Sequence, residues 1–258
     1  MGRIIAIANQ KGGVGKTTTA VNLATGVALA GDPVLLVDLD PQGNTTSGLG
    51  IDRSSLEKHS YEFLIGRASF AEVQKPTEIQ ELTLVPARID LIGAEVELVG
   101  VPDRERLLKR AIEGPRRSYS FVFIDCPPSL GLLTINALTA ADAVLIPVQC
   151  EYYAMEGLTQ LLHTIRLVKQ SFNPDLEIEG IVLTMFDPRN RISSQVEKEV
   201  RAHFGERVFT TVIPRNVALS EAPSFGKPIH LYDVRSKGAE GYTSLSRELI
   251  SNVKAGSR

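Results

Sequence analysis

A glycine-rich stretch near the N-terminus places lysines and threonines at spacings suited to phosphate chemistry. Residues 9–19 read Asn-Gln-Lys-Gly-Gly-Val-Gly-Lys-Thr-Thr-Thr, between an apolar run at 4–8 and a helical pattern at 20–29. A strand, a glycine turn and a helix in this order provide a nest of backbone N–H groups and a helix N-terminus, both of which attract anions. We expect Lys16 to reach the β- and γ-phosphates and the Thr17 hydroxyl to ligate Mg²⁺.

This stretch departs from the ordinary phosphate-loop pattern at one position. G-x-x-x-x-G-K-[ST] requires a glycine where this chain has Gln10, and a second lysine, Lys11, stands at the start of the loop. A glycine-rich turn with incidental lysines is the alternative interpretation. We favour the phosphate loop because both lysines and the threonines occur together between a strand and a helix.

Two further apolar runs end in carboxylates. Residues 34–37 lead into Asp38 and Asp40, and residues 121–124 end at Asp125. The carboxyl ends of parallel strands share the sheet edge where ligands bind, and a carboxylate on a buried strand suits the Mg²⁺ shell of a nucleotide site. A plain acidic turn is the alternative for the first pair, since Asp, Pro, Gly and Asn are common turn residues. An acid at the end of a strand is common, so Asp125 indicates a nucleotide site only in combination with the phosphate loop.

Strand-like and helix-like patterns alternate along the rest of the chain. Further strands are predicted at 82–86, 143–147, 180–184 and 208–213, and helical patterns at 54–71, 103–117, 154–172, 193–204 and 238–253. This alternation predicts an α/β fold with a single doubly wound, mostly parallel sheet that helices flank on both faces. No linker or repeat divides the pattern, so we expect one domain over residues 1–258.

Composition excludes several classes of protein. The chain has 258 residues, 43% of them hydrophobic, and a formal net charge of −2. Its two cysteines form no disulfide framework, its four histidines are far apart, and no apolar run approaches the roughly 18 residues of a membrane span. We therefore expect a cytoplasmic protein that does not enter a membrane. From Asp187 onward the chain has twelve Lys and Arg but only eight Asp and Glu, so the last quarter is mildly basic.

Taken together, the motifs resemble the deviant Walker A ATPases of the ParA/MinD superfamily, and most closely the short ParA/Soj chromosome-partitioning proteins. The resemblance covers essentially the whole chain through residues 11–18, 38–44, 125–131, 149–158, 213–216 and 219–224. It implies a P-loop ATPase that hydrolyses ATP to ADP and phosphate with Mg²⁺.

The resemblance also implies roles for individual residues. Lys11 would reach across a sandwich dimer to the partner's nucleotide, and Asp40 would position or activate the attacking water. Thr17 would bind Mg²⁺ with Asp125 in its shell. The catalytic residues are then Lys11, Lys16 and Asp40, and the nucleotide contacts are Lys11, Gly12, Gly13, Val14, Gly15, Lys16, Thr17 and Thr18, with Pro214 and Asn216 near the adenine ring.

The partners implied by the resemblance are a second copy of the chain, DNA and a regulator. The ATP-bound homodimer would bind double-stranded DNA without sequence preference, and a ParB-type centromere-binding protein would stimulate hydrolysis at the nucleoid. Arg189 matches a family DNA-contact position, and Lys227, Arg235, Lys237 and Arg247 are candidates from the basic last quarter. Relatives often carry arginine where this chain has Ala218. Either a DNA contact is lost at this position, or Arg191 or Arg215 makes up for it.

Two relatives with the same loops are alternatives. A MinD-like positioning ATPase would need a basic amphipathic C-terminal helix for the membrane interface, whereas the tail here carries only Arg247, Lys254 and Arg258 as basic residues. An electron-transfer ATPase like the nitrogenase iron protein would need cysteines that bridge a cluster, a context that neither Cys126 nor Cys150 has. The chain also starts at its first strand, so we expect no helix-turn-helix region for reading an operator.

Overall fold

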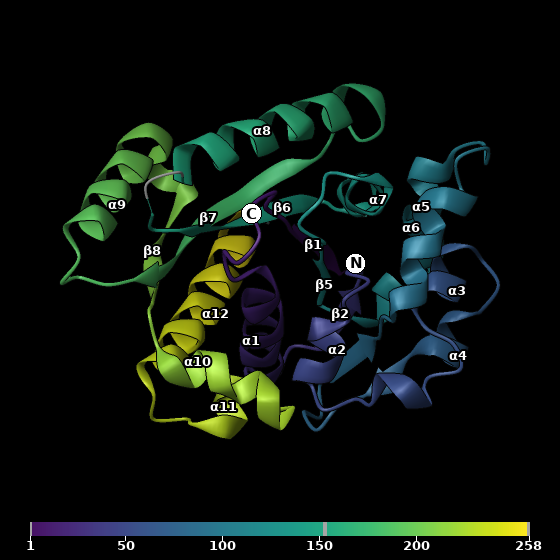
Figure 1. Ribbon diagram of the computed structural model, residues 1–258, viewed down its shortest axis with the longest axis horizontal. Helices are drawn as coiled ribbons and strands as arrows, with labels where there is room; N and C mark the ends of the chain where they lie inside the picture. The colour runs from purple at the N-terminus through teal and green to yellow at the C-terminus, as the bar shows by residue number, and fades with distance from the viewer. Residues whose placement is uncertain (1, 152–153, 257–258) are drawn as a thin grey trace.

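One sheet carries all the strands in the computed structural model, which describes residues 2–151 and 154–256 (Figure 1). Its strand order is β3-β4-β2-β5-β1-β6-β7-β8, with only the β3–β4 pair antiparallel among these described strands. The strands are β1 (Arg3–Ile7), β2 (Val34–Asp38), β3 (Lys75–Pro76), β4 (Leu82–Val85), β5 (Phe121–Asp125), β6 (Ala143–Gln149), β7 (Glu177–Phe186) and β8 (Val208–Pro214). This arrangement confirms the predicted α/β fold with a mostly parallel sheet.

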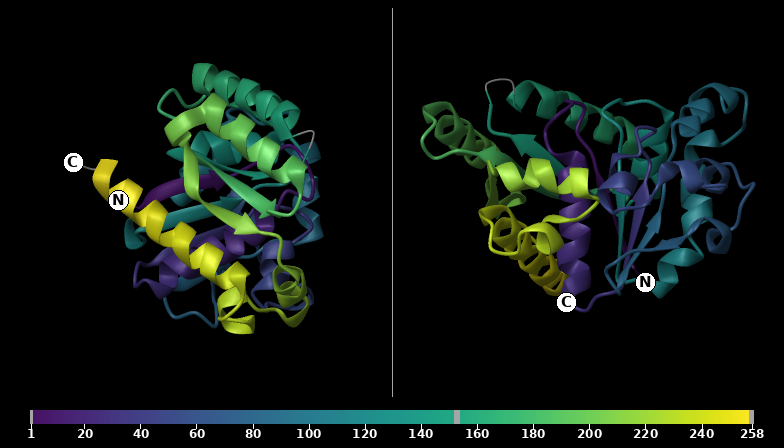
Figure 2. Two further views of the ribbon diagram at one scale, coloured as in Figure 1. Left: turned by 90° about the vertical axis from the view of Figure 1, so that its left-hand side faces the viewer. Right: turned by 60° about the horizontal axis from the view of Figure 1, so that its bottom comes forward.

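Helices cover both faces of this sheet. They are α1 (Lys16–Leu29), α2 (Asn44–Gly48), α3 (Ser60–Leu64), α4 (Phe70–Val73), α5 (Gly93–Glu97), α6 (Leu107–Ile112), α7 (Leu132–Ala140), α8 (Ala154–Ser171), α9 (Arg191–Phe204), α10 (Val217–Glu221), α11 (Ile229–Tyr232) and α12 (Lys237–Gly256). Figures 1 and 2 show α1 and α12 side by side on one face, and Figure 1 shows α7 and α8 on the other.

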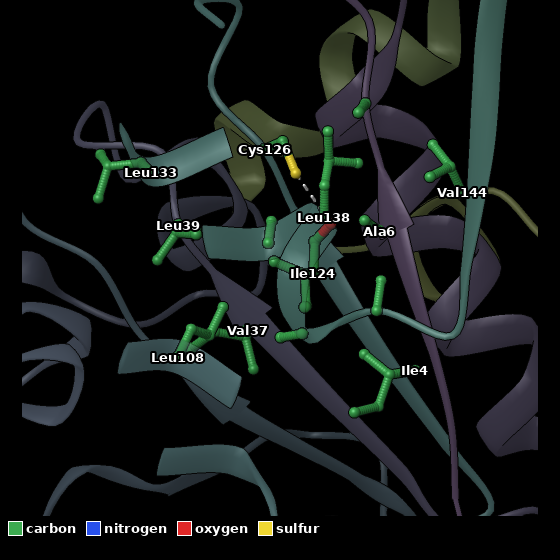
Figure 3. Close-up of a cluster of buried hydrophobic side chains, with 14 of the residues drawn as sticks. Ile4, Ala6, Val37, Leu39, Leu108, Ile124, Cys126, Leu133, Leu138 and Val144 are labelled. Atoms are coloured by element: carbon green, nitrogen blue, oxygen red, sulfur yellow. Dashed lines mark hydrogen bonds between the residues drawn. The ribbon is translucent and has the colours of Figure 1, made fainter. Parts of the chain in front are cut away.

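Successive side chains of β1 point to opposite faces of the sheet, and both faces are covered by apolar core. Ile4 and Ala6 pack with residues of α6, α7 and α8, whereas Ile5 and Ile7 pack with residues of α1 and α12. Successive strand residues point to opposite faces, so a strand that is apolar throughout must be covered twice. Figure 3 shows the first of these clusters, in which Cys126 lies buried just beyond the end of β5.

The segments with weak patterns differ most from expectation. The helix predicted over 103–117 is broken into a 3₁₀ turn at Arg104–Arg106, helix α6, and a second 3₁₀ turn at Pro115–Ser118. Pro115 prevents α6 from continuing, because proline has no backbone N–H to donate to the helical ladder. Helices α2 and α7 stand where no helix was predicted. They follow the two acidic strand ends, so each extends a loop of the predicted ligand edge.

Among the residues that the structure describes, no helix has both the length and the apolar character needed to cross a bilayer.

Candidate active site

The loop between β1 and α1 is anchored by the two neighbouring strands on one side of β1. The Asn9 side chain donates to the Pro147 carbonyl at 2.7 Å and accepts from the Lys11 backbone N–H at 3.0 Å. The Thr184 hydroxyl of β7 donates to the Val14 carbonyl at 2.8 Å. The sequence did not predict these contacts, because it does not show that β6 and β7 lie next to this loop in the sheet.

Two glycines let this loop close into a turn. Gly13 and Gly15 have φ angles of 76° and 86°, in the left-handed region that residues with a Cβ seldom adopt. Gly15 directly precedes α1, so the first N–H groups of a 14-residue helix face the loop. The predicted anion nest is thus present as a backbone shape.

Lys16 is a buried cation at the start of α1. Only 7% of the residue is exposed, and its Nζ donates to the Lys11 carbonyl across the loop at 3.0 Å. Burial lowers the pKa of this ammonium, and the nearby Asp125 and Asp40 partly oppose that shift. A desolvated cation beside a nest of N–H groups gains strongly from an anionic ligand.

A cavity of about 320 Å³ lies over this loop. It is lined by Gly12, Gly13, Gly15, Lys16, Thr17, Thr18, Asp40, Gln42, Asn44, Pro128 and Met185. Asp40 is 7% exposed, and its Oδ1 accepts from the Gln42 backbone N–H at 2.9 Å. The structure therefore brings Lys16, Thr17 and Asp40 to one cavity, as the sequence predicted.

Asp125 ends β5 below Thr17 and is fully buried. Its Oδ2 accepts from the Thr45 hydroxyl at 2.7 Å, whereas Oδ1 has no hydrogen bond of good geometry with the described residues. Burial raises the pKa of Asp125 to about 6, although the hydroxyls of Thr45 and Thr17 pull it downward. A buried carboxylate oxygen without a partner, next to a threonine hydroxyl, fits the oxygen ligands that Mg²⁺ prefers.

Asp38 lies beside Asp125 on the neighbouring strand and was not assigned a role from the sequence. The two residues are register partners between β2 and β5. Burial and the charge of Asp125 raise the pKa of Asp38, whereas the hydrogen bonds that it accepts from Thr46 and Asp40 oppose this rise. Asp38 therefore faces the protein interior, not the cavity that Asp40 lines.

A second cavity of about 330 Å³ adjoins the loop at Gly15 and Thr18. Pro214 and Asn216, predicted near the adenine ring, both line it, together with the apolar side chains of Met185, Ile213 and Leu219. The amide oxygen of Asn216 is buried and has no partner among the described residues. The cavity thus has apolar walls beside an amide oxygen that lacks a partner among the described residues, which suits a flat base with N–H donors.

Lys11 lies apart from the buried group, at the rim of the loop. Its side chain is 36% exposed, and its Nζ lies 3.7 Å from Oε2 of Glu151. The other oxygen of Glu151 lies 3.8 Å from Nη2 of Arg215. Ion pairs with this exposure are weak, about 0–1 kcal/mol, so Lys11 is free to leave for a stronger anion.

The predicted DNA contacts fall into separate regions. Lys237 lines a cleft with Pro188, next to Arg189, whose guanidinium makes two 2.9 Å hydrogen bonds to Asp187. Those bonds hold the pKa of Asp187 at about 2. Lys227 instead lines a cleft with Thr17 and Thr18, beside the nucleotide loop. The others, Arg235 and Arg247, are exposed before and on α12.

Comparisons with known proteins match most or nearly all of the chain. A family profile described as an AAA domain matches residues 2–178. The chain is 58% identical to the sporulation initiation inhibitor protein Soj of Bacillus subtilis, covering 98% of this chain and 100% of that protein. It is 59% identical to the chromosome partitioning protein ParA of Myxococcus xanthus, covering 97% of this chain and 88% of that protein.

Solved structures share the same fold. One is titled as a cobyrinic acid a,c-diamide synthase of Mycobacterium smegmatis with bound ATP analog and magnesium; it is 40% identical, with a TM-score of 0.88 over 99% of this chain and 97% of that one. The Pyrococcus furiosus cell division ATPase MinD is 28% identical, with a TM-score of 0.79 over 97% of this chain and 99% of that one. The chain is more than half identical to Soj and ParA over nearly its full length, and it carries the nucleotide loop, Asp40 and Asp125. It therefore belongs to the ParA/Soj family of chromosome-partitioning ATPases.

Proposed function

We propose that this Mg²⁺-dependent ATPase forms an ATP sandwich dimer, binds DNA without sequence preference in that state, and segregates DNA. The observation that carries the proposal is the separation of its two loop lysines. Lys16 is buried over the phosphate nest of its own chain, whereas the side chain of Lys11 is partly exposed at the rim. A cation at the rim is placed to meet the phosphates of a second copy, so that dimerisation completes each site.

The residues around the cavity divide the work of hydrolysis. The loop amides and Lys16 hold the phosphates, and Asp40 orients the attacking water from the facing wall. When bound, Mg²⁺ supplies charge neutralisation at the phosphate oxygens, and Thr17 and Asp125 are the residues that would hold it. Pro214 and Asn216 contact the base. Since phosphoryl transfer depends mainly on positioning and electrostatics, these groups account for the chemistry without a covalent intermediate.

DNA binding is proposed for the basic last quarter of the chain. Arg189, Lys237, Arg235, Arg247 and Lys227 are its candidates. Lysine and arginine contacts to phosphates carry no sequence information, so binding would be nonspecific and sensitive to salt. A ParB-type centromere-binding protein would then stimulate hydrolysis, and the protein would be found at the nucleoid. The names of two relatives support this role: the chromosome partitioning protein ParA of Myxococcus xanthus and the chromosome-partitioning ATPase Soj of Treponema pallidum.

Dimerisation with ATP is the first test. In sedimentation velocity, the wild-type chain should be a monomer without nucleotide and a dimer with Mg²⁺ and ATP. Lys11→Ala should bind ATP with near wild-type affinity and remain monomeric, because it lacks only the cross-interface cation. Lys109→Ala, at an exposed position of α6 away from the loop, is the matched control and should dimerise normally. A Lys11→Ala variant that dimerises like the wild type would refute the proposal.

A further inference from the structure

We propose that Asp38 is a positioning residue for ATP hydrolysis, which acts with Thr46 to fix the turn that carries Asp40. The inference rests on the proposed role of Asp40 in orienting water. Asp38 ends β2 and is fully buried, and it does not line the cavity that Asp40, Gln42 and Asn44 line. Its effect on the reaction must therefore pass through the backbone of the turn.

Within residues 2–151 and 154–256, the Asp38 carboxylate accepts three hydrogen bonds, and all of them come from the segment that follows β2. Oδ1 accepts from the backbone N–H of Asp40 at 3.2 Å. Oδ2 accepts from the backbone N–H of Thr46 at 2.9 Å and from its hydroxyl at 2.6 Å. One buried carboxylate thus bonds both ends of the turn from Asp40 to Thr46.

The Thr46 hydroxyl extends this network to the next strand. Its proton is donated to Asp38, so its oxygen is free to accept, and it does so from the Ala87 backbone N–H at 2.8 Å. Ala87 follows β4, which pairs with β2. The network therefore joins α2 to the ends of two neighbouring strands, in an interior where hydrogen bonds are strong and a missing partner is costly.

Contacts inside the turn transmit this constraint to the Asp40 side chain. The Gly43 backbone N–H donates to the Asp40 carbonyl at 2.9 Å, and the Gln42 N–H donates to Oδ1 of Asp40 at 2.9 Å. Space around the turn is small, since a Cβ on Gly43 would lie 2.9 Å from the Ala87 carbonyl oxygen. A shift at Thr46 would therefore move the turn as a unit and displace the Asp40 carboxylate.

Substitutions at Thr46 distinguish the contribution of its hydroxyl from the contributions of side-chain shape and charge. Thr46→Val keeps the shape and removes the hydroxyl, whereas Thr46→Ser keeps the hydroxyl. Asp38→Asn replaces one carboxylate oxygen with an amide NH₂, which cannot accept the hydrogen bonds that Asp40 or Thr46 donates to that oxygen. Thr139→Val is the matched control, because the Thr139 hydroxyl is fully buried in α7 and has no hydrogen-bond partner among the described residues.

The test measures steady-state ATP hydrolysis by each variant, with folding checked by circular dichroism. Thr46→Val and Asp38→Asn should lower kcat about 10- to 100-fold and leave KM for ATP within about threefold, because misplacement of about 1 Å costs that much in rate. Thr46→Ser and Thr139→Val should stay within about threefold of the wild-type kcat. In an Asp40→Ala background, Thr46→Val should slow hydrolysis no further, because the two changes act through one group.

Each remaining outcome contradicts one claim. A folded Thr46→Val variant with wild-type kcat, beside a slow Asp40→Ala variant, overturns this inference alone. Full additivity of Thr46→Val with Asp40→Ala overturns it as well. If Asp38→Asn does not fold, Thr46→Val decides, since it changes no charge; if that variant also fails to fold, the network is a scaffold and the inference is wrong. A normal kcat for Asp40→Ala refutes the proposed role of Asp40 itself.

Discussion

Lys16 and Asp125 show how burial prepares single residues for a charged ligand. Both are held out of water at one edge of the sheet, and burial moves each pKa toward the neutral form. An unpaired buried charge is costly, so each gains when a ligand supplies the opposite charge. The site residues of the nucleotide loop and Asp40 were predictable from the sequence, because type and spacing define them.

Lys16→Ala is expected to weaken ATP binding by about 100-fold or more, since it removes charge-assisted hydrogen bonds to phosphate. The free energy of unfolding without ATP should not fall, because the substitution also removes a desolvated ammonium. Isothermal calorimetry and urea unfolding measure the two effects. Near wild-type affinity for ATP would contradict the assignment of Lys16 to the phosphates.

Asp40→Ala is expected to bind ATP normally and to hydrolyse it at least 100-fold more slowly, because only the orientation of the attacking water is lost. Phosphate release in single-turnover assays measures the rate, and filter binding measures the affinity. A large loss of ATP affinity with an unchanged rate would assign Asp40 to binding and remove it from the chemistry.

At the scale of elements, packing between α1 and α12 supports the nucleotide loop, which precedes α1. The helices meet closely at Gly26, where an added Cβ would lie 2.1 Å from the Ser246 hydroxyl oxygen and 3.5 Å from the Tyr242 carbonyl oxygen. The Tyr242 hydroxyl lies 3.1 Å from that of Thr19, one turn below the nucleotide loop. The C-terminal helix thus holds α1 in place under the site.

Gly26→Ala should lower the free energy of unfolding by about 1–3 kcal/mol, because the added methyl group overpacks this crossing. Gly114→Ala is the control: its φ of −68° suits alanine, and a Cβ there would meet no atom within 4 Å. Urea unfolding compares the two. If Gly26→Ala were as stable as the wild type, the helices would have room to separate and would not brace the loop.

Helix α11 carries a buried histidine whose titration should affect stability. Both ring nitrogens of His230 are buried without a hydrogen-bond partner among the described residues, and burial lowers its pKa to about 4 from 6.5. The folded state therefore favours the neutral ring, so this stability is fully present above pH 6.5 and is lost as the pH falls toward 4. The linked loss is roughly 3 kcal/mol.

His230→Phe should remove this loss, because phenylalanine fills a similar space and does not titrate. Urea unfolding at pH 7.5, 6 and 5 would show a shallower decline for the variant than for the wild type. Parallel declines would mean that His230 is already charged or hydrated in the folded protein.

Long-range packing explains which elements were predictable. Strands β1, β2 and β5 were evident because each is apolar throughout, as a strand covered on both faces must be. Helices α2 and α7 were not. Helix α2 is five polar and small residues long, and α7 is buried on most of its surface, so neither sequence shows the one-sided apolar pattern of an amphipathic helix. The interior position of Asp38 was hidden because it depends on Asp125 of β5, 87 positions later in the chain.

At the scale of the whole molecule, the candidate DNA contacts lie in separate regions, one of them beside the nucleotide loop. Lys237 and Arg189 lie near one cleft beyond β8, whereas Lys227 lies beside the nucleotide loop. Two copies of each surface in a dimer would double the phosphate contacts, which is a physical reason for DNA binding to depend on ATP.

The most direct test is the affinity for random-sequence duplex DNA with ATP, with ADP and without nucleotide, from about 50 to 200 mM salt. We predict tight binding only with ATP, and a steep fall in affinity as salt rises, because the contacts are to phosphates. Lys11→Ala should bind DNA no better with ATP than without it. Equal DNA binding in all three nucleotide states, or ATP-dependent binding to anionic liposomes but not to DNA, would contradict the account.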